Sequence, residues 1–194
     1  MMAGVGGDAG ATVCVAPREI HDLVYRASRV AGCDPGTAER IGENVTLAEI
    51  HHGAAVRAFC ETLGAADLAT SAWATAPDAV LAAEVAARAD GTASAAFDPA
   101  VPLACVAAVL QQSLQRDVAA VGIDSGSRGD EMLAVVEMRT VDRDSAATSG
   151  ERIAGARRDA HRLGVGVDRV WFDALEAAAA GFLVDEATLD AIES

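Results

Sequence analysis

The stretch PREIHDLVYRASRVAGCDPGTAERIGENVTLAEIHHGAAVRAFCETLG, residues 17–64, decides the fold of this chain. Pro17 suits the first position of a helix, and apolar residues then recur at helical spacing for about fourteen residues. Gly32 ends this helix, and Asp34-Pro35 starts the next one as N-cap and first helical residue. The second helix continues to the end of the stretch, with a possible bend at Gly53. Two helices joined by a tight turn predict an antiparallel helical hairpin.

The middle of the chain alternates helical patterns with loops. Residues 77–88 and 102–115 are predicted helices, whereas Trp73 and Pro77 mark a loop between the hairpin and the first of them. Residues 93–97 favour a short strand. Residues 118–123 and 132–140 are rich in Val, Ile and Met, and the turn-rich sequence DSGSRGD lies between them. This arrangement predicts a β-hairpin.

The last third of the chain is predicted to be helical after a polar loop at residues 141–150. Helices are expected over residues 151–163, after Asp168, and after Asp185. No internal repeat or linker divides the sequence. We therefore expect an α+β fold: a helix-rich single domain over residues 16–194 with an N-terminal helical hairpin and a small antiparallel hairpin or sheet. Residues 1–15 are rich in Gly and Ala and indicate a flexible N-terminus.

The charge balance limits the partners that the protein can have. The 194 residues carry 15 basic and 29 acidic side chains, a net charge of −14, and every basic residue is Arg. Such a surface repels phosphate backbones and anionic lipids, so we expect neither nucleic acid nor membrane as a partner. The absence of Lys is typical of GC-rich coding in a high-GC prokaryote.

The four cysteines, Cys14, Cys33, Cys60 and Cys105, are widely and unevenly spaced. They match neither a disulfide framework nor a zinc motif and indicate small buried thiols in a reducing compartment. No secretory signal is visible, so a cytoplasmic location is expected. The glycine-rich start, GVGGDAG, does not fit the G-x-G-x-x-G spacing of a dinucleotide loop, so no cofactor is predicted.

Two stretches resemble known families. Residues 17–64, together with GVGVDRVWFDALEAAAAGFLVDEATL at residues 164–189, resemble an uncharacterised bacterial family classed as a domain of unknown function. The N-terminal part is also similar to the helical head of type-2 malate/L-lactate dehydrogenases. Their S-H-G motif has its counterpart in His51-His52-Gly53, where His replaces Ser, and Arg57 falls one residue later than in that family. The resemblance implies a shared helical architecture and does not imply the reaction.

Glu49 and His52 are the candidate catalytic residues. They lie three apart on the second predicted helix, and hence on one face. Glu-x-x-His also supplies ligands in di-iron carboxylate proteins, but those need two such motifs and this chain has one. A metal would need further ligands such as His21 or His161, and a surface ion pair is the simpler interpretation, so no metal site is predicted. His52 could instead act as a general acid or base.

A second candidate site is a basic cluster in this acidic chain: Arg157, Arg158, His161 and Arg162. Arg157 and His161 are one helical turn apart, as are Arg158 and Arg162. Such a cluster could bind a carboxylate or phosphate, although a solvated helix face has the same pattern.

These observations leave three functional hypotheses. The first is a non-catalytic accessory, regulatory or oligomeric component, possibly a homodimer or bound to a protein partner. It follows from the missing catalytic signature and from Ala-rich helices that permit close packing. The second is a small metal-dependent or acid/base enzyme centred on Glu49 and His52. The third is an anion or small-molecule binding module that uses the basic cluster.

Overall fold

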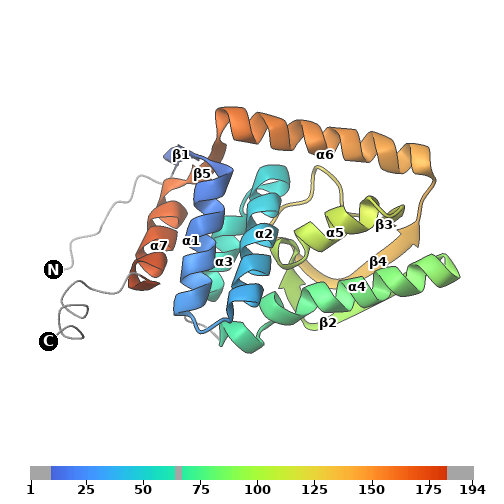
Figure 1. Cartoon of the computed structure of the whole chain (residues 1–194), viewed down its shortest axis with the longest axis horizontal. Coiled ribbons are helices and arrows are strands. Elements are labelled where there is room, and N and C mark those ends of the chain that lie inside the picture. The colour runs from blue at the N-terminus through green and yellow to red at the C-terminus, as the bar shows by residue number, and fades with distance from the viewer. Residues whose placement is uncertain (1–9, 64–66, 183–194) are drawn as a thin grey trace, which may run out of the picture.

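The helical hairpin predicted from residues 17–64 is present in the computed structural model, which describes residues 10–63 and 67–182 (Figure 1). Its helices are α1 (Pro17–Val30) and α2 (Pro35–His52). The side chain of Asp34 accepts hydrogen bonds from the amides of Gly36 and Thr37 at the start of α2, as expected of an N-cap. α2 ends at Gly53, and α3 (Ala55–Thr62) follows as a separate helix.

The remaining helices and strands complete the predicted α+β fold. The helices are α4 (Ala72–Asp90), α5 (Ala107–Leu114), α6 (Arg143–Leu163) and α7 (Arg169–Ala179), with single 3-10 turns η1 (Leu68–Thr70), η2 (Leu103–Cys105) and η3 (Ala180–Phe182). The strands are β1 (Thr12–Val15), β2 (Thr92–Pro102), β3 (Val118–Ala120), β4 (Met132–Thr140) and β5 (Val165–Asp168). The helix expected after Asp185 lies outside the described residues.

The strands form two small antiparallel sheets. One has the order β2-β4-β3, so the predicted hairpin of residues 118–140 is present and the strand predicted at 93–97 joins it as part of β2. The other pairs β1 with β5, from Thr12 opposite Asp168 to Val15 opposite Val165. Residues 12–15 therefore belong to a strand and not to a flexible lead-in. The sequence did not predict this pair because its strands are four residues long and lie far apart in the chain.

Two helix boundaries also differ from the prediction. α4 starts at Ala72, because Ser71 caps it by accepting from the amide of Trp73, so Trp73 and Pro77 lie in a helix and not in a loop. α6 starts at Arg143, because Asp142 accepts from the amide of Ser145, so most of the loop predicted at residues 141–150 is helical. In both cases an N-cap hydrogen bond starts the helix where the polar composition had suggested a loop.

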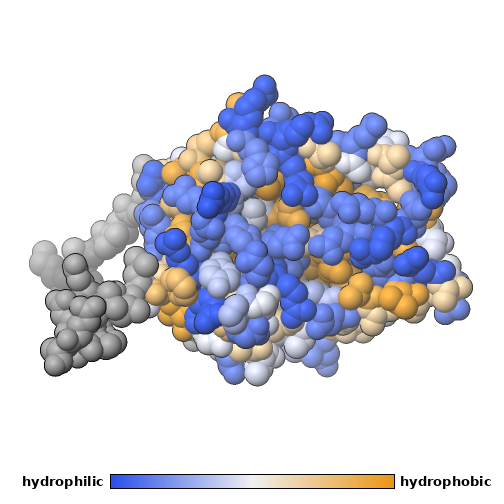
Figure 2. All heavy atoms as spheres, viewed as in Figure 1, coloured by the Kyte–Doolittle hydropathy of each residue, from blue (hydrophilic) through white to orange (hydrophobic). Residues whose placement is uncertain are grey.

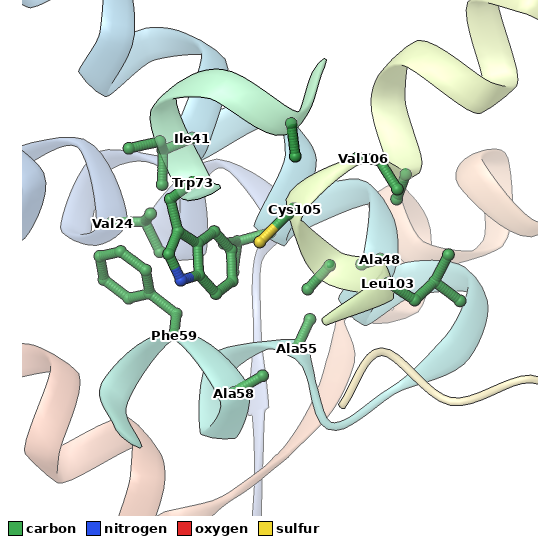
Figure 3. Close-up of a cluster of buried hydrophobic side chains, with 14 of the residues drawn as sticks. Val24, Ile41, Ala48, Ala55, Ala58, Phe59, Trp73, Leu103, Cys105 and Val106 are labelled. Atoms are coloured by element: carbon green, nitrogen blue, oxygen red, sulfur yellow. The ribbon is translucent and has the colours of Figure 1, made fainter. Parts of the chain in front are cut away.

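The core lies between the hairpin, α3 and α4. Phe59 of α3 and Trp73 of α4 pack edge to face, with ring centroids 5.5 Å apart, and Figure 3 shows Val24, Ile41 and Cys105 around them. A second attachment joins α4 to α5. Buried Glu84, 1% exposed, accepts from Ser113 at 2.9 Å and from Arg116 Nε at 2.6 Å. These contacts join α1 to α5 into one packed unit, and α6 lies against this unit.

Candidate functional site

α6 lies against the unit formed by α1 to α5 and buries few of its side chains there. It runs along one side of the molecule from β4 to β5 (Figure 1), and of its 21 residues only Ala146 and Ala160 are buried. With Ile153 these residues are spaced seven apart, which places them on one stripe of the helix. Within the described residues, no hydrogen bond or ion pair joins residues 146–161 to another element. Apolar contact along this stripe therefore holds the middle of α6.

Small residues beside this stripe leave space on both flanks of α6. Ser149 and Ala156 lie on one flank, and Gly150 and Ala154 lie on the other. Because these side chains are short, they do not reach α5 and the loop after β3, and a cavity remains on each side. In Figure 2 hydrophobic side chains are visible between the hydrophilic ones where α6 crosses the molecule.

The cavity on the first flank, here called the histidine cavity, has a volume of about 260 Å³. His51 and His52 reach it from the end of α2, and Arg152 reaches it from α6. Its other polar residues are Gln111, Asp124, Ser125 and Ser149. The rest of the lining is apolar: Ile50, Ala107, Leu110, Leu114, Ala119, Ala120, Ile123, Ile153 and Ala156.

The orientation of His52 is fixed by the loop between β3 and β4. Its Nδ1 lies 3.0 Å from the carbonyl oxygen of Ser127. A carbonyl can only accept, so Nδ1 carries the hydrogen and Nε2 keeps its lone pair. The loop itself is attached to the α2–α3 corner, because the amide of Gly129 donates to the carbonyl of Gly53 at 3.0 Å. His52 therefore offers one nitrogen acceptor of defined position.

Burial keeps both imidazoles uncharged at neutral pH. Desolvation lowers the pKa of His51 to about 4, with smaller contributions from His52 and from the charge of Arg157. Desolvation also lowers the pKa of His52, although the carbonyl of Ser127 and the acidic residues Glu131 and Asp124 oppose this effect. Neutral imidazoles can accept hydrogen bonds or protons from a bound molecule.

The cavity on the second flank, here called the arginine cavity, has a volume of about 360 Å³. Three of the four residues of the predicted basic cluster border it, namely Arg157, Arg158 and His161. Arg162 does not, and its guanidinium lies 3.4 Å from Asp159 one turn earlier. Its other lining residues are Ala146, Gly150, Ile153 and Ala154 of α6 and, from α5 and the residue after it, Gln111, Leu114 and Gln115.

The arginines beside the cavities have no carboxylate partner among residues 10–63 and 67–182. Within the described residues, the salt bridges of α6 are Arg143 with Asp117 and Arg162 with Asp159. Arg152, Arg157 and Arg158 make none, although the chain carries nearly twice as many acidic as basic side chains. Three unpaired cations therefore border the two cavities of an acidic protein, and such a position is favourable for an anion.

Glu49 lies apart from these cavities. It is 6% exposed, and its Oε2 accepts the amide of Val56 at 2.8 Å. The amides of Ala54 and Ala55 also face its carboxylate, while desolvation raises its pKa. Ala54 cannot cap α3 with its own side chain, so Glu49 supplies the cap from the preceding helix. Glu49 thus lines neither of the two cavities, whereas His52 lines the histidine cavity.

Residues 10–63 and 67–182 contain no group of three or more His, Cys, Asp or Glu side chains that could hold a metal ion. In the same ranges, no helix is both long and apolar enough to cross a membrane.

Arg57, named in the family resemblance, pairs with Glu61 at 2.9 Å and lies over the ring of Trp171.

Sequence reasoning did not identify the cavities or several of their residues, notably Arg152, Gln111 and Ser125. One signal was available: Ala146, Ile153 and Ala160 mark the inner stripe of a helix whose neighbouring residues are Gly, Ala and Ser. Small residues on both sides of a narrow apolar stripe indicate a helix whose side chains leave cavities between it and the neighbouring elements. The loop boundary predicted at residue 150 hid this pattern.

Comparison with known proteins gave no matching family model, no matching curated relative and no matching solved structure. The resemblance to the head of type-2 malate/L-lactate dehydrogenases therefore stays a prediction, and the functional argument has only the geometry of the two cavities as its basis.

Proposed function

We propose that this protein is a non-catalytic binding module for a small organic anion, which it holds in the arginine cavity between α5 and α6. The observation that carries the proposal is the pair Arg157 and Arg158. Both residues are exposed, line a cavity of about 360 Å³ and have no carboxylate partner among the described residues. In a chain of net charge −14, unpaired cations beside a concave surface favour a bound anion.

The lining supports an organic anion in preference to a simple ion. Leu114, Ile153 and Ala154 give the cavity an apolar floor, and the amides of Gln111 and Gln115 add hydrogen-bonding groups. An apolar floor with a few polar groups is the usual composition of a small-molecule site. A dicarboxylate or a phosphate ester would place its charge on the arginines and its carbon skeleton on this floor.

Thermal unfolding in the presence of succinate or inorganic phosphate, at constant ionic strength set with NaCl, tests this proposal. A bound anion should raise Tm with the logarithm of its concentration. Arg158→Gln should weaken this rise. Arg162→Gln, a matched control on the same helix whose arginine lies outside the cavity, should leave it unchanged. An equal response of both variants and the parent protein would contradict the proposal.

The acid/base alternative has support from His52 alone. Its fixed Nδ1–H and free Nε2 suit proton transfer, but Glu49 is committed to the amides of α3. Two further expectations remain predictions: a homodimer or protein partner, and a cytoplasmic location. The prediction of buried thiols is confirmed for Cys33 and Cys105, whereas Cys14 is exposed and Cys60 is partly exposed.

A further inference from the structure

The histidine cavity has the composition of a second, separate ligand site. Most of its lining is apolar, and its polar groups come from four parts of the fold: α2, α5, α6 and the loop after β3. Ligand sites commonly combine apolar walls with a few polar groups that fix the orientation of the ligand. A volume of about 260 Å³ suits a molecule with a single ring or a short branched chain.

Two of these polar groups have a free hydrogen-bonding position. The Nδ1–H of His52 is used by the carbonyl of Ser127, so Nε2 is an acceptor that needs a donor. Arg152, on the α6 side, has no hydrogen bond or ion pair within the described residues. Asp124 lines the same cavity but forms no ion pair with Arg152, and its Oδ1 accepts the amide of Gly126 at 2.6 Å within the loop.

These two groups demand opposite features of a ligand. Nε2 of His52 accepts, and it selects a hydroxyl or another donor. The guanidinium of Arg152 donates and carries charge, and it selects a carboxylate. The walls between them, formed by residues such as Leu110, Ile123 and Ala156, select an apolar body.

We propose that the histidine cavity binds a small hydroxylated apolar carboxylic acid, with its hydroxyl donating to Nε2 of His52 and its carboxylate on Arg152. This site shares Gln111, Leu114 and Ile153 with the arginine cavity but uses different polar anchors. Either site can therefore exist without the other, and the failure of one proposal leaves the other standing.

Calorimetric titration with 4-hydroxybenzoate, benzoate and phenol tests both anchors on the unmodified protein. 4-Hydroxybenzoate should bind more tightly than benzoate, which lacks the hydroxyl, by about threefold to tenfold, as expected of one hydrogen bond. It should also bind more tightly than phenol, which lacks the carboxylate. Equal affinities for the three compounds, or no heat of binding from 4-hydroxybenzoate at millimolar concentration, would overturn the proposal.

Variants then assign each preference to its residue. Arg152→Gln should remove the preference over phenol, and His52→Phe, which keeps a ring of similar size, should remove the preference over benzoate. Arg158→Gln should change neither. If Arg158→Gln and not Arg152→Gln weakens binding of 4-hydroxybenzoate, the ligand occupies the arginine cavity and the second site does not exist. Circular dichroism of each variant checks that it folds, and Arg152→Gln removes no contact on which the fold depends.

Discussion

α2 and α6 are helices of similar length that differ in how much of each is buried. α2 has 18 residues, of which nine are buried, and α6 has 21 residues, of which two are buried. α2 is also joined to its neighbours by specific hydrogen bonds: Asn44 Oδ1 accepts the amide of Ala108 at 2.8 Å, and Glu49 caps α3. No such bond was found for the middle of α6 in the part of the chain that the structure describes. The difference indicates that α2 contributes more to stability, whereas α6 borders the two cavities.

The strongest test of this difference is the same substitution in both helices. Ile41 of α2 is fully buried, and Ile41→Ala should destabilise the protein by about 2–5 kcal/mol, because it removes buried apolar groups and leaves a void in the core. Ile153 of α6 lines both cavities, and Ile153→Ala should cost only about 1 kcal/mol, because the space beside it already exists. Urea unfolding of both variants measures the two values. Equal destabilisation would show that α6 is as much a part of the core as α2.

A smaller effect is expected where the loop of the histidine cavity is attached to the end of α2. A Cβ atom added at Gly129 would lie 2.5 Å from the carbonyl oxygen of Gly53. Gly129→Ala should therefore displace the loop and destabilise the protein by about 1–3 kcal/mol. Gly126→Ala is the control, since its Cβ would meet only the Asp124 side chain of the same loop, at 3.1 Å. If the control were the more damaging of the two, the attachment at Gly53 would not be what positions this loop.

The histidines at the end of α2 should make stability depend on pH. The pKa of His51 is about 4 in the folded protein and ordinarily 6.5. Between these values the unfolded chain binds more protons than the folded one, so stability should fall as the pH drops from 6.5 to about 4. His51→Gln should flatten this slope, as measured by urea unfolding across that range. An unchanged slope would mean that the His51 ring is solvated and titrates normally.

The two helices also differ in how far the sequence predicts them. The hairpin could be predicted because Asp34-Pro35 and Gly32 are strong local signals and the apolar spacing before Gly32 is regular. α6 was predicted only from residue 151, because its first turns are polar and its N-cap, Asp142, stands among other polar residues. Local composition favoured a loop there, and the cap hydrogen bond decided in favour of a helix.

The candidate site was predictable in part, for a related physical reason. The basic cluster was visible as a helical pattern, and three of its four residues do border a cavity. The cavities themselves depend on how α6 lies over α5 and on the loop that orients His52, and these are contacts between residues far apart in the chain. Glu49 and His52 share a spacing that suggested joint action. The turn at Gly53 instead places the first amides of α3 against the carboxylate of Glu49, and no local sequence pattern predicts this contact.

The most direct test of the central claim, that α6 forms two independent cavities, is one pair of substitutions two residues apart on that helix. Ala154 lines only the arginine cavity, and Ala156 lines only the histidine cavity. Leu is a good helix former and would fill either space, so both variants should fold. Ala154→Leu should abolish the response of Tm to succinate and phosphate and retain binding of 4-hydroxybenzoate. Ala156→Leu should do the reverse, whereas loss of both ligands in both variants, or of neither in either, would contradict the claim.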